Sequence, residues 1–338
     1  MQARVYAWIQ EQLDAAETGK RCVVAHGRTE RDRMRKAVEA HMAIEILPLV
    51  FARPTYWQDL KPRARMRHKM HALQQLYPDL VFAGSSAAVA YGLAVSNRFL
   101  DKVWVRTDRK AHRRQSAYLR PVMVSHGATE RRQGLLVTAL ARTVGDCLRL
   151  MDFRAGLAIA DSALRMQGLT PQALGEKMRR DCWHMSGLAR ALEVLALADG
   201  RAESGGESIA RATMLELGMA APDLQRGYTS PIDPAVTYRA DFVWSVAGGD
   251  IVGELDGPEK YESEELRGGR TIAQVIGDEH RRQSHIEACQ GVLRMVRFGF
   301  SDVMREVAFL QLLEGCGVPR SYALDERVVR AGGVLRCR

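Results

Sequence analysis

Residues 238–244 read YRADFVW and residues 251–257 read IVGELDG, and this stretch decides the fold of the chain. At a period of two, Asp241 lies on the opposite face of the first segment from its aromatic side chains, and Glu254 and Asp256 share one face of the second. Two glycines between the segments are typical of a tight hairpin turn. The sequence therefore predicts a β-hairpin that carries three carboxylates. Like charges so close are costly unless a cation or a proton neutralises them, which favours a divalent-metal site.

The composition is that of a globular protein with more than one domain. The chain has 338 residues, 46% hydrophobic and 26% charged, which is longer than one core usually spans. No apolar run approaches the roughly 18–20 residues of a membrane span, and the N-terminus lacks the layout of a signal peptide. The six cysteines are scattered without a Cys-x-x-Cys pair, as in reduced proteins. We expect a cytoplasmic protein with no membrane partner and no cofactor other than a metal.

The charge is unevenly distributed along the chain. Residues 1–200 contain 32 Lys and Arg against 19 Asp and Glu, a net charge of +13, whereas residues 201–338 contain 17 against 21, a net charge of −4. A positive charge confined to one part of a chain favours a polyanionic partner such as DNA. The alternative is a solvated basic surface.

Residues 1–75 have the pattern of a winged-helix-like DNA-binding module. Helical spacing over residues 1–17 is followed by a very basic helix, with Thr29 as the expected N-cap, and by a strand-like run at residues 44–51. In a winged helix such a basic helix enters the DNA major groove; the alternative is a helical hairpin with a solvated basic face. A second basic helix is expected from Pro62, and a basic run follows at residues 109–114. The predicted nucleic-acid-binding residues are Arg31, Arg33, Arg35, Lys36, Arg63, Arg65, Arg67, Lys69, Arg109, Arg113 and Arg114.

Residues 76–199 are expected to form a mixed α/β domain. A strand near residue 81 turns at Ser85-Ser86 into a small-residue helix that Gly92 ends. Such a junction can hold an anion, but it lacks the lysine of a P-loop, and we interpret it as structural packing. Strands are predicted at residues 102–107 and 121–125, and helices at about 138–150, 153–167 and 171–197. A domain boundary is predicted at Asp199-Gly200.

This N-terminal part resembles the AbiEi-like proteins. The resemblance covers about residues 1–165 and rests on the helix and wing, on residues 85–93 (SSAAVAYGL) and on residues 141–146 (ARTVGD). AbiEi-like proteins pair an N-terminal winged helix with a mixed α/β domain and include antitoxins of type IV toxin–antitoxin systems. The resemblance therefore implies DNA binding and a cognate toxin or defence-system partner. The wing departs from the family, because residues 47–49 (LPL) stand where most AbiEi-like wings carry an Arg-Gly turn.

Residues 200–310 predict the order helix, strand, strand, helix, strand, helix. Ser204 and Glu207 form a Ser-x-x-Glu capping box at the first helix. Capping explains both residues, but the same helix end can also place Glu207 in a metal site. After the hairpin we expect a charged loop at residues 259–270, a helix from about Thr271, a strand at residues 292–298 and a last helix. Residues 311–338 form a tail without a motif that we interpret.

This order, with Asp241 and Glu254-x-Asp256, resembles the PD-(D/E)XK nuclease superfamily, and more closely the small domain related to very-short-patch repair endonucleases. The match spans about residues 203–302 and includes Ser204-x-x-Glu207, Arg211, Gln225 and residues 291–297 (GVLRMVR). It implies an α/β sandwich around a mixed sheet and hydrolysis of phosphodiester bonds with Mg²⁺ (or Mn²⁺).

The resemblance also implies roles for individual residues. Asp241 and Glu254 would hold the metal, with assistance from Glu207. Asp256 stands where the superfamily carries a lysine, so Lys260, Arg282 or Gln283 is expected to supply the missing positive charge or water contact. The predicted catalytic residues are Asp241, Glu254, Asp256, Lys260 and Gln283, and the predicted metal ligands are Glu207, Asp241 and Glu254.

Three hypotheses follow for the whole chain. The first is a DNA-binding, metal-dependent endonuclease. The second is an antitoxin-type transcriptional repressor of a toxin–antitoxin or phage-defence system, whose nuclease-like fold is catalytically degenerate. The third is a solvated hairpin face without function, which the joint occurrence of the acidic residues in the right element order disfavours. The DNA sequence recognised and the oligomeric state, including a homodimer, stay open.

Overall fold

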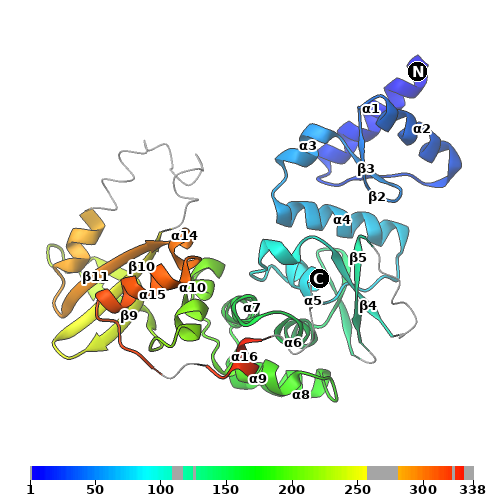
Figure 1. The fold of residues 1–338 in the computed structure, drawn as a ribbon. Helices are drawn as coiled ribbons and strands as arrows, with labels where there is room; N and C mark the ends of the chain where they lie inside the picture. The colour runs from blue at the N-terminus through cyan, green and yellow to red at the C-terminus, as the bar shows by residue number, and fades with distance from the viewer. Residues whose placement is uncertain (1, 109–116, 125–126, 257–280, 322–323, 331–338) are drawn as a thin grey trace. The chain divides into compact units, whose positions relative to one another are not determined.

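The structure is a computed structural model that describes residues 2–108, 117–124, 127–256, 281–321 and 324–330 (Figure 1). It is a mixed α/β protein with several small sheets, as predicted. The chain forms two compact units, Met1–Cys147 with Gly175–Met185, and Leu148–Leu174 with Ser186–Arg338. The predicted domain limits at residues 75, 199 and 310 stay a prediction, because one compact unit can contain more than one domain.

The N-terminal module has the predicted order of helix, basic helix and hairpin. Helices α1 (Ala3–Thr18) and α2 (Gly27–Glu39) are joined through β1 (Val23–Val24), and β2 (Ile44–Leu47) pairs with β3 (Val50–Ala52). The three strands are antiparallel in the order β1-β3-β2. The prediction of Thr29 as N-cap is wrong: the N-cap of α2 is His26, three residues earlier, and the His26 N–H donates to the Glu30 carboxylate at 2.7 Å. That carboxylate satisfies the free backbone donor without Thr29.

The rest of the first unit is a set of helices beside two small two-stranded pairings. Its helices include α3 (Pro54–Asp59), α4 (Pro62–Leu76), α5 (Gly84–Tyr91) and α6 (Leu140–Leu150), the last of which extends past Cys147. Strands β4 (Val103–Thr107) and β5 (Leu119–Met123) are parallel, and β6 (Thr129–Arg132) and β7 (Leu135–Thr138) are antiparallel. Gly92 ends α5 in a left-handed conformation, φ 86°, as predicted. Ser86 is buried and its Oγ accepts from the Trp104 N–H at 2.8 Å, so this serine has the predicted packing role.

Helices α7 (Phe153–Gln167), α8 (Pro171–Asp181) and α9 (Leu188–Ala196) follow. The single helix predicted over residues 171–197 is therefore two helices. The break covers residues 182–187, between the end of α8 at Asp181 and the start of α9. Gly187, the N-cap of α9, has a φ of 83°, a left-handed conformation that favours glycine.

The second unit is built around a four-stranded mixed sheet. After α10 (Gly205–Glu216) come β8 (Asp223–Thr229), β9 (Thr237–Val246), β10 (Gly249–Asp256) and β11 (Val292–Gly299), in the sheet order β11-β10-β9-β8. The β8–β9 and β9–β10 pairs are antiparallel and β10–β11 is parallel. The predicted hairpin is thus confirmed as β9–β10. Strand β8 was not predicted, because it is largely polar and contains Gly227.

Helices cover this sheet. Ala210 and Met214 of α10 share a core with Phe242, Trp244 and other side chains of the sheet, together with Phe309 of α15 (Glu306–Gly315). Residues 281–287 are helical, and Ile286 packs in a second cluster with Val243 and Val252. The predicted arrangement of helices around a mixed sheet is confirmed. Short helices α14 (Phe300–Val303) and α16 (Glu326–Val329) complete the unit.

Two composition-based expectations can be compared with the described residues. Five of the six cysteines lie there, and all five are free thiols, as expected. No helix in the described ranges combines the length and the apolar character needed to cross a membrane.

Candidate functional site

The structure places the predicted carboxylates on three neighbouring elements of the second unit. Asp241 lies on β9, Glu254 and Asp256 lie on β10, and Glu207 lies in the first turn of α10. Glu207 and Glu254 are buried, with 8% and 6% of their surface exposed. A buried carboxylate requires hydrogen bonds or a counter-charge, so the partners of each define what the site can do.

Glu207 combines capping with a place in the cluster. Its N–H donates to the Ser204 Oγ at 3.1 Å, which is the predicted N-cap contact. Its Oε2 accepts from the Glu203 N–H at 2.8 Å. The same oxygen also accepts a bond from Gln225, so capping does not use up this carboxylate.

Gln225 joins Glu207 to Asp241. Its Nε2 donates to Glu207 Oε2 at 3.2 Å and to Asp241 Oδ1 at 3.3 Å, and the Leu255 N–H donates to Asp241 Oδ2 at 3.1 Å. Burial raises the pKa of Glu207, and the negative charge of Asp241 raises it further, against hydrogen bonds that lower it. Gln225 has φ 55°, a left-handed conformation that is uncommon outside glycine. Sequence reasoning named Gln225 only within the family resemblance, because one polar residue in a polar segment has no periodic signal.

The two carboxylates of β10 are each met by an arginine. Arg282 Nη2 donates to Glu254 Oε1 at 2.8 Å and to the Arg239 carbonyl at 2.7 Å. Asp256 forms an ion pair with Arg297 of β11, in which Arg297 Nε donates to Oδ2 at 3.2 Å. Glu254 and Asp256 share a strand face, as predicted, but their charges are met by arginines from different elements. Among the described residues expected to replace the superfamily's lysine, Arg282 contacts Glu254, and its catalytic role stays a prediction.

The remaining predicted site residues lie elsewhere or outside the described part. Gln283 Nε2 donates to Glu287 Oε1 at 2.9 Å and makes no described contact with the four carboxylates. Lys260 lies outside the described residues. His285, in the same helical segment as Gln283, is half-buried, and its Nδ1 lies 2.7 Å from the Tyr238 hydroxyl.

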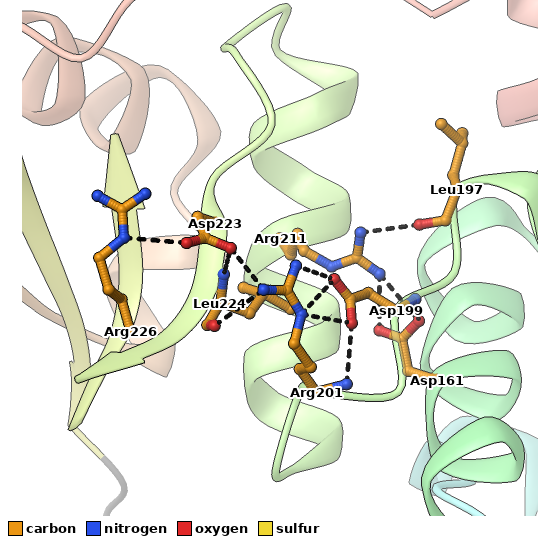
Figure 2. A network of polar contacts seen from close by, with 8 residues as sticks. All are labelled: Asp161, Leu197, Asp199, Arg201, Arg211, Asp223, Leu224 and Arg226. Carbon is orange, nitrogen blue, oxygen red and sulfur yellow. Dashed lines mark hydrogen bonds and ion pairs between the residues drawn. The ribbon is translucent and has the colours of Figure 1, made fainter. Parts of the chain in front are cut away.

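A polar network fixes the elements that carry Glu207 and Gln225 (Figure 2). Arg211 lies one turn after Glu207 on α10, and its Nη2 donates to both oxygens of Asp161 on α7 at 2.8 Å. The Asp199 N–H donates to Asp161 Oδ1 at 2.7 Å. Arg201 binds both Asp199 and Asp223, and Asp223 also accepts from Arg226 of β8 at 3.0 Å. The network therefore links α7, α10 and β8.

The donor set suits a hard divalent cation in chemical type. Mg²⁺ is commonly held by one or two carboxylates together with waters and a substrate phosphate, and Glu207 and Asp241 already lie within 3.3 Å of one nitrogen atom. Within the described ranges, however, no group of three or more His, Cys, Asp or Glu side chains is arranged to hold a metal. The described residues therefore fit a cation site made of two carboxylates, Glu207 and Asp241. Glu254 is not counted because it accepts a hydrogen bond from Arg282.

The predicted nucleic-acid-binding residues of the first unit have three kinds of surroundings. Arg31, Arg35 and Lys36 are exposed on α2, whereas Arg33 lies over the Trp8 ring, 4.9 Å from its centroid. On α4, Arg65 donates to the Trp57 and Gln58 carbonyls at 2.9 and 2.7 Å, and Lys69 donates to the Asp101 carbonyl at 3.3 Å. Arg63 and Arg67 of the same helix are half-buried without such bonds. The last three, Arg109, Arg113 and Arg114, lie outside the described residues.

Comparison with known proteins gives relatives without a stated activity. No protein-family model matches the chain. Part of it is similar to two proteins of Mycobacterium tuberculosis, the uncharacterized protein MT2308 of strain CDC 1551 / Oshkosh and the uncharacterized protein Rv2248 of strain ATCC 25618 / H37Rv. Each is 31% identical over 168 residues, which are 46% of this chain and 59% of the relative. The chain thus spans less than two thirds of the relatives' length.

Proposed function

We propose that the chain is a DNA-binding protein whose second unit hydrolyses phosphodiester bonds with a divalent metal, Mg²⁺ or Mn²⁺. The observation that carries the proposal is the joining of Glu207 and Asp241 through one amide nitrogen, beside Glu254 on the adjacent strand. These residues come from a helix and from two consecutive strands that follow it, as the nuclease resemblance implies, with the unpredicted β8 between the helix and the two strands. The PD-(D/E)XK resemblance and the basic first 200 residues support the same reading.

The chain's own residues have separate tasks in this proposal. Glu207 and Asp241 would hold the cation, and Gln225 would keep the two carboxylates in place. A bound Mg²⁺ polarises a phosphoryl oxygen and lowers the pKa of an attacking water. Arg282, held by the Arg239 carbonyl, would stand where the superfamily's lysine acts and would orient Glu254. The basic first unit would bring DNA to this site, in the cytoplasm.

Incubation of the protein with plasmid DNA and Mg²⁺ or Mn²⁺ tests this function. We expect cleavage by the wild type and loss of at least about 100-fold in rate for Asp241→Ala and Glu254→Ala, because both change the acidic cluster. Asp250→Asn is a matched control, since Asp250 lies on β10 but bonds to Ser245, Tyr228 and Arg226. Cleavage that survives Asp241→Ala would reject the site.

One observation favours a second candidate, the antitoxin-type repressor with a cognate toxin or defence-system partner. Each of the four carboxylates already accepts a bond from this chain: Gln225 bonds to Glu207 and Asp241, Arg282 to Glu254 and Arg297 to Asp256. Such a domain can be stable without a cation. Salt-sensitive binding of a DNA fragment without metal-dependent cleavage would favour this candidate.

A further inference from the structure

Helix α4 contains two kinds of basic side chain. Arg65 and Lys69 project from one side of the helix and end on backbone carbonyls. Arg63 and Arg67 lie one turn apart on another side, and both are half-buried. The second pair differs from the first because it has no comparable acceptors.

Two nitrogen atoms of this arginine pair lack hydrogen-bond acceptors. Arg63 Nη2 and Arg67 Nε are buried, and neither has a hydrogen-bond acceptor in the described part of the chain. No carboxylate among the described residues forms an ion pair with either guanidinium within 4.0 Å. Burial lowers the pKa of Arg63, and the positive charge of Arg67 lowers it further. The two cations therefore repel each other in a partly dehydrated place.

His71 continues the same helix face by one more turn. Burial lowers the pKa of His71, and the nearby His68 and Arg67 lower it further. His68 is itself engaged, with its ring nitrogens at 2.7 Å from the Tyr56 hydroxyl and 2.8 Å from the Ala64 carbonyl. The groups facing the arginine pair from this helix are thus basic or neutral, and none of them can serve as a counter-ion.

The missing partner can be described by its chemistry. Buried guanidinium N–H groups need acceptors, and a guanidinium stays charged at every physiological pH. Two adjacent guanidinium groups suit an anion with several oxygens directed at both, which a phosphate group offers and a single neutral carbonyl does not. We propose that Arg63 and Arg67 form a binding site for a phosphate group.

The phosphate group can come from a nucleic-acid backbone or from a small phosphorylated molecule. The first source deepens the proposed DNA binding and rests on it, whereas the second does not. In either case Arg63 and Arg67 act differently from the exposed Arg31 and Arg35, whose charges are already solvated. Binding would relieve an unfavourable arrangement, so the pair should lower stability in the absence of ligand.

The test compares the wild type with the double variant R63M/R67M in three measurements. In phosphate-free buffer we expect the variant to unfold at a higher temperature than the wild type, because Met fits a partly apolar site without a charge. Inorganic phosphate at millimolar concentration should raise the wild-type unfolding temperature more than that of the variant. Binding of a short duplex at about 0.1 M salt should weaken roughly tenfold, with the slope of log affinity against log salt reduced by about 1–2.

The double variant R4M/R21M is the matched control, since Arg4 and Arg21 are exposed and lie in the same unit. It loses the same charge and also reveals the general effect of phosphate on stability. If R63M/R67M behaves like this control in both the phosphate and the DNA measurements, the site is rejected. If it unfolds at a lower temperature and responds normally to phosphate, the arginines are structural and the inference is again wrong.

The remaining outcomes identify the source of the phosphate group. Loss of the phosphate response with DNA affinity equal to the control indicates a small phosphorylated ligand. Loss of both indicates the nucleic-acid backbone. If the wild type binds no DNA but responds to phosphate through Arg63 and Arg67, the proposed function fails while the site stands. If the wild type binds DNA, and neither DNA affinity nor the response to phosphate depends on Arg63 and Arg67, the proposed DNA binding stands and the phosphate site is rejected.

Discussion

Arg211 is buried and Arg63 is half-buried, and the surroundings of these two arginines are opposite. Arg211 is 4% exposed and donates to both oxygens of Asp161 and to the Leu197 carbonyl, with only its Nε lacking an acceptor among the described residues. Arg63 is half-buried beside a second cation and has no described acid within reach. A buried charge whose counter-ion comes from the chain itself fixes one arrangement of the fold. A buried charge without a counter-ion or hydrogen-bond acceptor in the chain favours binding of an external one. The two arginines therefore distinguish scaffold from candidate site within one chain.

The largest expected effect on stability concerns Arg211, the buried arginine that has a counter-ion. Asp161→Ala leaves Arg211 buried without its counter-ion and should lower the free energy of unfolding by about 3–5 kcal/mol. Urea unfolding, followed through the transition of the second unit, measures this loss. The double variant D161L/R211M should recover much of it, because two apolar side chains can replace a buried ion pair. If Asp161→Ala is as stable as the wild type, the Asp161–Arg211 pair does not stabilise the fold, and Arg211 does not differ from Arg63 in this respect.

Arg282→Met examines a pair of intermediate burial. Arg282 is 39% exposed while the side chain of Glu254 is 7% exposed, so the variant leaves a buried carboxylate without its main cation. We expect a loss of about 1–3 kcal/mol at neutral pH, less than for Asp161→Ala because water reaches the arginine. Mn²⁺ should restore part of this loss if the cluster binds a cation. Thermal unfolding with and without Mn²⁺ measures both effects, and an unchanged stability would contradict the pairing.

Gln225→Leu removes the donor shared by Glu207 and Asp241. Loss of these bonds should reduce the free energy of unfolding by about 1–2 kcal/mol at pH 7. The loss should shrink as the pH falls through the raised pKa of Glu207, because protonation abolishes the repulsion between the two acids. Gln225→Asn is a control that keeps the amide and the demanding backbone position. A loss independent of pH would show that Gln225 acts through packing alone.

The smallest effect concerns the exposed end of the network. Burial opposes ionisation of Asp199, but its bonds to Arg201 outweigh burial and lower the pKa, and Asp223 is lowered by Arg201 and Arg226 in the same way. A lowered pKa contributes stability above the unfolded value, about 3.9, and that stability is lost as the pH falls through the folded value. Arg201→Gln should therefore cost about 0.5–1 kcal/mol at pH 7 and almost nothing near pH 2. Acid titration of both proteins measures the difference; a constant difference would contradict it.

The sequence predicted the parts of the fold that have a strong period. The β9–β10 hairpin, the order of helix and hairpin in the N-terminal module, and the end of α5 at Gly92 all follow from alternation or from glycine. Strand β8 was missed because its polar residues do not alternate cleanly and Gln225 has a left-handed φ. The break at residues 182–187 was missed because apolar residues keep helical spacing on both sides of it.

The sequence predicted which acidic residues form the candidate site, but it did not predict which arginine pairs with each of them. Spacing placed Asp241, Glu254 and Asp256 on adjoining strands, and the structure has them there. Which arginine meets which carboxylate depends on the contact of β10 with β11 and with the helical residues 281–287, and no local pattern states this. In the same way, Arg63 and Arg65 are equivalent in the sequence pattern and are both half-buried, and only their hydrogen-bond acceptors in the structure distinguish them.

The membership of α7 in the second unit has a consequence for dissecting the protein. A fragment that begins at residue 200 would contain Arg211 and lack Asp161, its counter-ion. Moreover, the backbone passes between the two units after Cys147, after Leu174 and after Met185. The passages after Cys147 and Leu174 lie inside α6 and α8, whereas the passage after Met185 lies between two helices, where limited proteolysis is expected. A cut there would leave two polypeptides that both contribute to the second unit, so nicked protein should co-purify as one species until it is denatured.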